Sequence, residues 1–301
     1  MLTITVHPAK ELRKRDRFDL LQHENPRELS STNLVASFVD ELRIPIEVDN
    51  LIPDHLKSLT YQEIEELPIL WGNQIISLKS IATIYGDATD GKVIFAGETD
   101  CLKRIGAKMT EGCIEVHGNA GWHLGREMRG GEIKVFGDVG DYCGGEMAGG
   151  KIIVLGNAGN HVGGAFPGSP KGIRGGFIYI QKNAGHEIAT QMRRGWIIVG
   201  GNCGDFCGAG MIAGSLWIFG KTGMGTGTGM KRGTIVASDC TELPPTFCQS
   251  TRDLPRFLQF YFHSLREENI EFPAIWGKRL FQLYRGDLLE KGLGEIWIPC
   301  P

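Results

Sequence analysis

Residues 131–149 read GEIKVFGDVGDYCGGEMAG, and residues 150–168 repeat the same frame as GKIIVLGNAGNHVGGAFPG. Both units are nineteen residues long, and both open on a glycine. The irregular step lies between Gly150 and Gly176, where seven residues are inserted. A fixed period of this length is typical of proteins built from stacked repeats. The same frame opens at Gly112, Gly131, Gly150, Gly176, Gly195, Gly214 and Gly233.

Two apolar columns appear when the units are aligned, and they lie two residues apart. The first column is Ile114, Ile133, Ile152, Ile178, Ile197, Leu216 and Ile235. The second column is Val116, Val135, Val154, Ile180, Val199, Ile218 and Ala237. β-Branched side chains at alternate positions predict a short strand with one buried face in every unit. Because the same residues recur one unit apart, successive strands are expected to pair in parallel and in register.

Two further columns are expected to point inward. One is a column of flexible side chains, which suit an irregular interior: Met109, Met128, Met147, Phe166, Met192, Met211 and Met230. The other is Leu124, Cys143, Val162, Ile188, Cys207 and Thr226. A single unit cannot bury its own apolar face, so the columns predict a core that neighbouring units share.

Glycine and asparagine mark the predicted corners. One glycine column is Gly121, Gly140, Gly159, Gly185, Gly204 and Gly223. Another is Gly125, Gly144, Gly163, Gly208 and Gly227, interrupted by Ala189. These positions are expected to need a positive φ or a close approach of two backbones. A polar column stands just before the first glycines and is expected to form a hydrogen-bond ladder: Asn119, Asp138, Asn157, Asn183 and Asn202.

The repeat therefore predicts an all-β core, a right-handed parallel β-helix of about eight 19-residue coils. Residues 91–95, GKVIF, form a degenerate first coil. A mixed N-terminal segment is expected before the repeat, and a helix with terminal strands is expected as a cap after it. The predicted divisions are residues 1–80, 81–239 and 240–301.

The C-terminal flank changes in composition. Ser250 and Asp253, followed by Pro255, predict the start of a helix. This helix is expected to pack on the last coil or to dock on a partner subunit through a wide apolar stripe: Leu254, Phe257, Leu258, Tyr261, Phe262 and Leu265. Residues 281–298, FQLYRGDLLEKGLGEIWI, are expected to form two strands around a loop that contains glycine.

The N-terminal flank and the bulk composition restrict the class of protein. Residues 2–6 predict a strand, and Thr60 with Glu63 resembles a capping box that opens a short helix. The net charge of −3 indicates that the protein is not a general binder of nucleic acid or of membrane surfaces. The charged start is not that of a secretory signal, and no apolar run is long enough to span a bilayer. A cytoplasmic location is expected.

Local motifs do not assemble a catalytic, cofactor-binding or metal-ligating set. Residues 86–92 match GxxxxGK, but a strand pattern follows where a phosphate-binding loop needs a helix, so a turn is expected. Cys203 and Cys207 are separated by three residues instead of the two of zinc clips, so buried thiols are expected. Asp138 and Asp141 share one coil without forming the stacked acidic cluster that glycan cleavage would need.

Two features remain open between a structural and a binding role. His123, Tyr142 and His161 share a column and are expected to be neighbours, with the two histidines two coils apart, roughly 9–10 Å. They form either a polar surface stripe or a binding patch. The insertion at residues 164–175, GAFPGSPKGIRG, is either a passive surface loop or a contact for a partner.

The frame GGxIxVxGNAGxxVGxxMxGG resembles the C-terminal β-helix domain of glutamate synthase. It resembles more closely the C subunit of formylmethanofuran dehydrogenase and its bacterial counterpart in the formyltransferase/hydrolase complex. Residues 71–73, WGN, and residues 284–298, YRGDLLEKGLGEIWI, are similar to that family. Residues 243–247, LPPTF, and the segment PRFLQFYFHSLR after them favour the bacterial complex. The resemblance spans residues 65–301.

The resemblance implies a non-catalytic scaffold in one-carbon metabolism, whose partners are sister subunits of a hetero-oligomer. The bacterial complex moves a formyl group from tetrahydromethanopterin to a methanofuran analogue and hydrolyses it to formate. The alternative is the C subunit of a tungsten or molybdenum formylmethanofuran dehydrogenase. In both, metal and catalytic residues are expected in sister subunits, so this chain is expected to bind no cofactor. A third possibility, of another class, is a stand-alone β-helix enzyme acting on carbohydrate.

Overall fold

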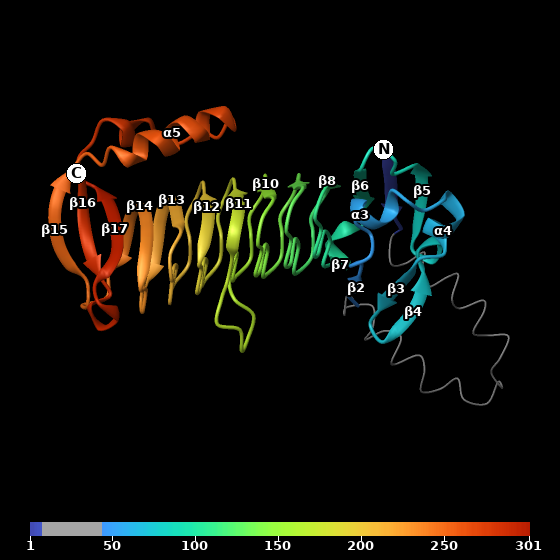
Figure 1. Cartoon of the computed structure of the whole chain (residues 1–301), viewed down its shortest axis with the longest axis horizontal. Helices are drawn as coiled ribbons and strands as arrows, with labels where there is room; N and C mark the ends of the chain where they lie inside the picture. The colour runs from blue at the N-terminus through green and yellow to red at the C-terminus, as the bar shows by residue number, and fades with distance from the viewer. Residues whose placement is uncertain (8–43) are drawn as a thin grey trace, which may run out of the picture.

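The computed structural model describes residues 1–7 and 44–301, and these residues are mostly β-structure with few helices. One large sheet dominates, and its strands stand side by side along the long axis of the molecule (Figure 1). In spatial order they are β15 (Cys248–Asp253), β16 (Phe281–Gly286), β17 (Leu293–Pro299), β14 (Arg232–Glu242), β13 (Ser215–Met224), β12 (Arg194–Val199), β11 (Arg174–Ile180), β10 (Lys151–Val154), β9 (Glu132–Val135), β8 (Cys113–His117), β6 (Lys92–Gly97), β1 (Leu2–Val6) and β5 (Ala82–Gly86). The sheet is open, with β15 and β5 at its edges.

Shorter elements surround the large sheet. A second, small sheet contains β4 (Gln74–Ser77), β3 (Pro68–Trp71), β2 (Ile46–Glu47) and β7 (Leu102–Lys103). The α-helices are α3 (Pro53–Leu56), α4 (Tyr61–Glu65) and α5 (Phe257–Glu267). The 3₁₀ turns among the described residues are η1 (Leu78–Ser80), η2 (Thr99–Cys101), η3 (Ala274–Gly277) and η4 (Leu288–Glu290). The predicted capping box is present, since the Thr60 side chain accepts from Glu63 N–H and the Glu63 carboxylate accepts from Thr60 N–H.

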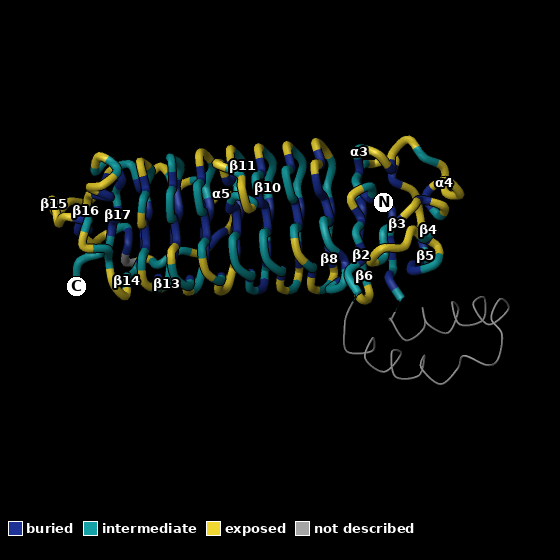
Figure 2. Tube along the Cα trace, turned by 90° about the horizontal axis from the view of Figure 1, so that it is seen from below, coloured by how far each residue is buried: buried dark blue, intermediate teal, exposed yellow. Residues whose placement is uncertain are grey.

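Successive repeat strands pair in parallel and in the predicted register. Ile114 lies opposite Ile133, which lies opposite Ile152. The register continues across the insertion, where Ile152 lies opposite Ile178. The first two apolar columns are fully buried, and Figure 2 shows buried segments recurring from one coil to the next. Residues 92–96 of β6 pair in the same way with β8, as the degenerate first coil predicts.

The third apolar column differs from the prediction at one position. Phe166 was expected between Met147 and Met192, but it is only half-buried, and Ile173 fills the inward position with no exposed surface. In the other coils, the residue after each methionine donates its N–H to the carbonyl of the methionine one coil before. Arg174 N–H donates to Met147 O, and Arg193 N–H donates to Ile173 O, so Ile173 takes the place of a methionine in this pattern. Placing Phe166 in this column was wrong because the inserted residues come before the column and not after it.

The two glycine columns serve different purposes. Gly144, in the second column, has φ of +64°, which lies in the left-handed region that glycine adopts without strain. Gly121, in the first column, has no positive φ, but a Cβ placed there would lie 2.5 Å from the carbonyl oxygen of Leu102. The first column therefore permits close approach of neighbouring coils, and the second permits the turn itself.

The polar column forms the ladder that the sequence predicts. Each side-chain oxygen accepts from a backbone N–H of the following coil, as when Asn183 Oδ1 accepts from Asn202 N–H at 2.8 Å. Asn202 Oδ1 in turn accepts from Lys221 N–H at 2.8 Å. The ladder runs through Asn119, Asp138, Asn157, Asn183 and Asn202. These bonds tie the corners together where the strands have ended.

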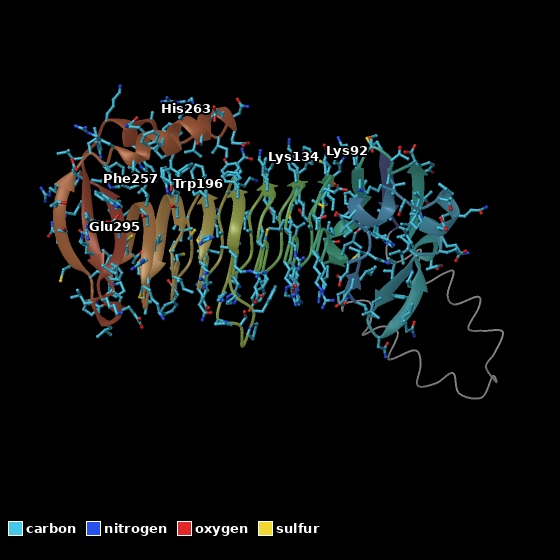
Figure 3. All side chains as sticks on the ribbon, viewed as in Figure 1. Lys92, Lys134, Trp196, Phe257, His263 and Glu295 are labelled. Carbon is cyan, nitrogen blue, oxygen red and sulfur yellow. The ribbon has the colours of Figure 1, made fainter. Side chains whose placement is uncertain are left out.

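The outer face of the sheet is also buried over β11–β14, contrary to the prediction of one buried face. Ile198, Trp217 and Val236 point outward and are fully buried. They belong to a second core that includes Leu258 and Phe262 of α5. Figure 3 shows Trp196 and Phe257 between the helix and the strands, with His263 on the outer side of the helix.

Helix α5 accordingly packs across the side of the sheet and not on the end of the last coil. Its Tyr261 ring lies 4.9 Å from the rings of both Trp196 and Trp217. The helix begins at Phe257. The predicted helix start at Ser250 and Asp253 was wrong, because both residues belong to strand β15. The two predicted tail strands, β16 and β17, pair antiparallel and lie between the edge strand β15 and the repeat strand β14. Strand β17 also pairs in parallel with β14.

Replacing Asn202 tests the ladder. In Asn202→Ala the N–H of Lys221 loses its acceptor, and we expect the free energy of unfolding to fall by about 0.5–1.5 kcal/mol. Asn202→Asp keeps an oxygen at the same place and should retain most of the stability. Urea denaturation of the three proteins measures the difference. Equal losses in both variants would show that the side-chain oxygen contributes nothing.

Two neighbouring phenylalanines test the packing of α5. Phe262 is 1% exposed and Phe260 is 78% exposed. We expect Phe262→Ala to cost about 3–5 kcal/mol, because it leaves a cavity against Trp217. Phe260→Ala is the matched control and should change stability by about 0.5 kcal/mol or less. Similar melting temperatures for both variants would mean that the helix does not hold the outer core.

Candidate functional site

A stack of aromatic rings is the clearest candidate site among the described residues. The rings of His123 and Tyr142 lie 5.2 Å apart at 20°, and those of Tyr142 and His161 lie 4.5 Å apart at 14°. The three come from successive coils at one repeat position, so the predicted neighbourhood is confirmed. The Tyr142 ring lies between the imidazoles, and this prevents the two histidines from sharing one metal ion.

The insertion closes over this stack. Phe166 lies 5.5 Å from the His123 ring and 5.4 Å from the Tyr142 ring. Arg126 lies over the Phe166 ring, with its guanidinium carbon 4.4 Å from the ring centroid. Glu146 Oε1 accepts from Phe166 N–H at 3.2 Å and holds the loop in place. Sequence reasoning missed the roles of Phe166 and Arg126, because the insertion breaks the frame from which columns are read.

The backbone under the stack is left-handed. The φ angles of His123, Tyr142 and His161 are +64°, +59° and +59°. Glu187 and Phe206 continue the column at +57° and +58°. Side chains other than glycine are uncommon in this region and cost roughly 1 kcal/mol or more each. Glycine occupies the equivalent position at Gly225, where φ is +69° and this cost does not arise.

Burial and nearby positive charges disfavour protonation of His123. Burial, and then the positive charges of Arg126, Arg104 and Lys103, hold the pKa of His123 below its ordinary value of 6.5. Its Nδ1 is buried without a hydrogen-bond partner in the described part of the chain. His161 differs, since its Nδ1 lies 3.5 Å from Glu187 Oε2. Burial also raises the pKa of the Tyr142 hydroxyl, with smaller contributions from Glu187 and Asp141.

The GxxxxGK motif is a turn, as predicted. Asp87 Oδ1 accepts from Thr89 N–H at 3.0 Å, and Asp90 Oδ1 accepts from Lys92 N–H at 3.0 Å. Strand β6 follows directly. The Lys92 ammonium pairs with Glu115 at 2.8 Å, so it is not held ready for a phosphate.

The two spaced cysteines are buried thiols, as expected. Cys207 is fully buried in its inward column, and Cys203 is 8% exposed. Burial is the first cause of the raised pKa of Cys203, and its neighbour Cys207 adds to it. Burial likewise raises the pKa of Cys143 to about 12. Protonated thiols of this kind are poor nucleophiles and poor metal ligands.

The aspartates are used by a second ladder that the sequence analysis did not foresee. Asp141 Oδ1 accepts from Asn160 N–H at 2.7 Å, and Asp205 Oδ1 accepts from Met224 N–H at 2.8 Å. Asn160 Oδ1 accepts from His186 N–H at 2.8 Å, and His186 Nδ1 accepts from Asp205 N–H at 3.0 Å. Within residues 1–7 and 44–301, no group of three or more histidine, cysteine or acidic side chains is placed to hold a metal ion.

Comparison with known proteins supports the resemblance drawn from the sequence. The family model described as the GXGXG motif matches residues 113–250. The C subunit of tungsten-containing formylmethanofuran dehydrogenase 2 from Methanothermobacter marburgensis is 35% identical over 98 residues. Its equivalent from Methanococcus maripaludis is 34% identical over 92 residues. The first alignment spans 36% of that relative and 31% of this chain.

A solved structure extends the similarity to the whole chain. A chain in the crystal structure of the formyltransferase/hydrolase complex (FhcABCD) from Methylorubrum extorquens, in complex with methylofuran, superposes with a TM-score of 0.83. The sequences are 28% identical, and the match covers 99% of this chain and 100% of that chain. The fold and the repeat thus define a β-rich protein that contains a GXGXG motif and is similar to a component of that complex. None of the described helices is long and apolar enough to cross a lipid bilayer.

Acidification tests the environment of His123. Its pKa is lower in the folded than in the unfolded chain, so below about pH 6.5 the unfolded chain takes up a proton that the folded chain does not. Stability should therefore fall as the pH drops from about 7.5 to about 5.5. We expect His123→Tyr to reduce this fall and Phe260→Ala, which removes no titratable group, to leave it unchanged, as measured by urea denaturation. An identical pH dependence in His123→Tyr and wild type would contradict the assignment.

Proposed function

We propose that this protein is a non-catalytic scaffold subunit of a formyltransferase/hydrolase complex in methanofuran-linked one-carbon metabolism. The observation that carries the proposal is the similarity to a chain of the FhcABCD complex over 99% of the sequence. The flanking segments that resemble the bacterial protein lie inside this match. Partners are sister subunits, and formyl transfer and hydrolysis to formate occur on them. A cytoplasmic location remains a prediction.

Strand pairing and the hydrogen bonds at the corners also support a β-helix. We infer that the repeat is a right-handed parallel β-helix of about eight coils, which residues 81–239 form between flanking parts at 1–80 and 240–301. Parallel strands, bridges between Ala120 and Val139 and their equivalents, and the asparagine ladder all recur at the repeat spacing and support this inference. Right-handed crossovers are the rule for parallel strands.

A rigid stack suits a scaffold for physical reasons. Its faces are fixed by hydrogen bonds in every coil, so a partner that docks on them loses little conformational entropy in the process. The side chains that resemble catalytic groups are engaged in structural roles: Asp141 and Asp205 accept backbone N–H groups, and Cys203 and Cys207 are buried. We propose that cofactors of the complex, a methanofuran analogue and tetrahydromethanopterin, bind to sister subunits.

A second candidate is the C subunit of a tungsten or molybdenum formylmethanofuran dehydrogenase. The 35% identity to the Methanothermobacter marburgensis protein favours it, although the alignment covers 31% of this chain. Both candidates assign the same scaffold role to this chain. They differ in the chemistry of the partners, since the dehydrogenase reading requires subunits with iron–sulfur clusters and a metal–pterin.

Purification of a tagged copy from its native host tests the proposal. We expect larger sister subunits to co-purify, and the complex to release formate from a formylated methanofuran analogue. The chain purified alone should release none. Native mass spectrometry and metal analysis complete the experiment, because iron together with tungsten or molybdenum in the complex would select the dehydrogenase. Formate release by the isolated chain, or its recovery without any partner, would refute the scaffold role.

A further inference from the structure

A basic groove lies at the amino-terminal ends of strands β12, β13 and β14. It has a volume of about 530 Å³, and its floor contains Ile212 and Ala213. Cationic side chains line it from the coils on both sides of that floor: Arg193, Arg194, Lys231 and Arg232. Lys291 and Glu290, from the turn between β16 and β17, close one end.

The charges of this basic groove are strongly unbalanced. Five cationic side chains face a single carboxylate, that of Glu290, which lies 4.0 Å from Lys231 Nζ. Among the described residues, Arg193, Arg194 and Arg232 make no ion pair. Like charges gathered in a concave, partly apolar surface repel one another and attract an anionic partner. The net charge of the chain is −3, so this local positive field is opposite in sign to the molecule as a whole.

An exposed apolar lip adjoins the groove. Leu288, Leu289 and Leu293 are 54%, 83% and 45% exposed. The turn that carries them is firmly held, because the 3%-exposed Asp287 accepts from Gly229 N–H at 3.0 Å and from Leu289 N–H at 2.9 Å. Exposed leucines on a fixed turn next to unpaired arginines form a surface suited to binding another protein.

Two projections flank the groove. The insertion before β11 and the turn between β16 and β17 extend from the same edge of the sheet, and the starts of β12, β13 and β14 lie between them (Figure 1). The insertion contributes the exposed Lys171 and leads into the exposed Arg174. The basic groove therefore lies between two projecting segments.

We propose that this groove binds an acidic segment of a sister subunit. Carboxylates of that segment pair with Arg193, Arg194 and Arg232, because the planar guanidinium binds a carboxylate through two hydrogen bonds. Apolar side chains of the same segment pack against Leu289. This inference rests on the scaffold role proposed above and assigns one docking surface to it.

Charge reversal in the groove tests the proposal on the full chain. The variant is Arg193→Glu with Arg232→Glu, and Leu289→Asp tests the lip separately. The matched control is Arg129→Glu, because Arg129 occupies the repeat position of Arg193 but lies outside the groove and is likewise exposed. Binding of purified sister subunits to the immobilised chain is measured over a range of salt concentrations, and melting temperatures verify that each variant is folded.

We expect the double reversal to weaken binding at least about tenfold and to flatten its salt dependence. Leu289→Asp should weaken binding as well, and Arg129→Glu should bind as wild type does. Unchanged affinity in folded groove variants, or an equal loss in Arg129→Glu, would overturn the proposal while leaving the scaffold role intact. Failure of the wild-type chain to bind any sister subunit would instead refute the scaffold role. Groove-dependent binding of a labelled oligonucleotide, with sister-subunit binding unaffected, would also overturn the inference.

Discussion

Backbone hydrogen bonding between units nineteen residues apart is the constraint on which the rest of this protein depends. Strands β8 to β14 each pair in parallel with the next, and every pair keeps isoleucine or leucine opposite its equivalent. A shift of one residue would turn every buried side chain to the opposite face. Corner ladders oppose such a shift, because each Asn or Asp oxygen binds the backbone of one particular neighbour.

Fixed register has consequences for the surface. A side chain at one repeat position lies directly beside its equivalents, so similar residues form continuous stripes. The rings of His123, Tyr142 and His161 stack for this reason, and arginines recur along the edge where the strands begin. The insertion, which interrupts the period, and the turn between β16 and β17, which follows the repeat, supply the irregular shapes. We infer that recognition depends on these interruptions together with the stripes beside them.

The alignment of columns predicted much of the interior correctly, because burial in a repeat is decided locally and then copied. It placed Met147, Cys143 and Val162 inward, and it anticipated the asparagine ladder. It was wrong about Phe166, since the position of an insertion within a unit does not follow from its length. It was also wrong about the start of α5, because the polar segment Cys248–Asp253 pairs with β16, and that pairing is not encoded in its own pattern.

The sequence by itself determined the period, the pairing of like residues and the inward columns, because each follows from side chains that repeat at a fixed spacing. It also carried the resemblance that the comparisons support. Only the tertiary structure decided which distant segments complete the sheet: β1 beside β6, and β17 beside β14. It likewise placed α5 over Trp196 and Trp217 and gathered the basic groove. These contacts join residues far apart in the chain, and no local period specifies them.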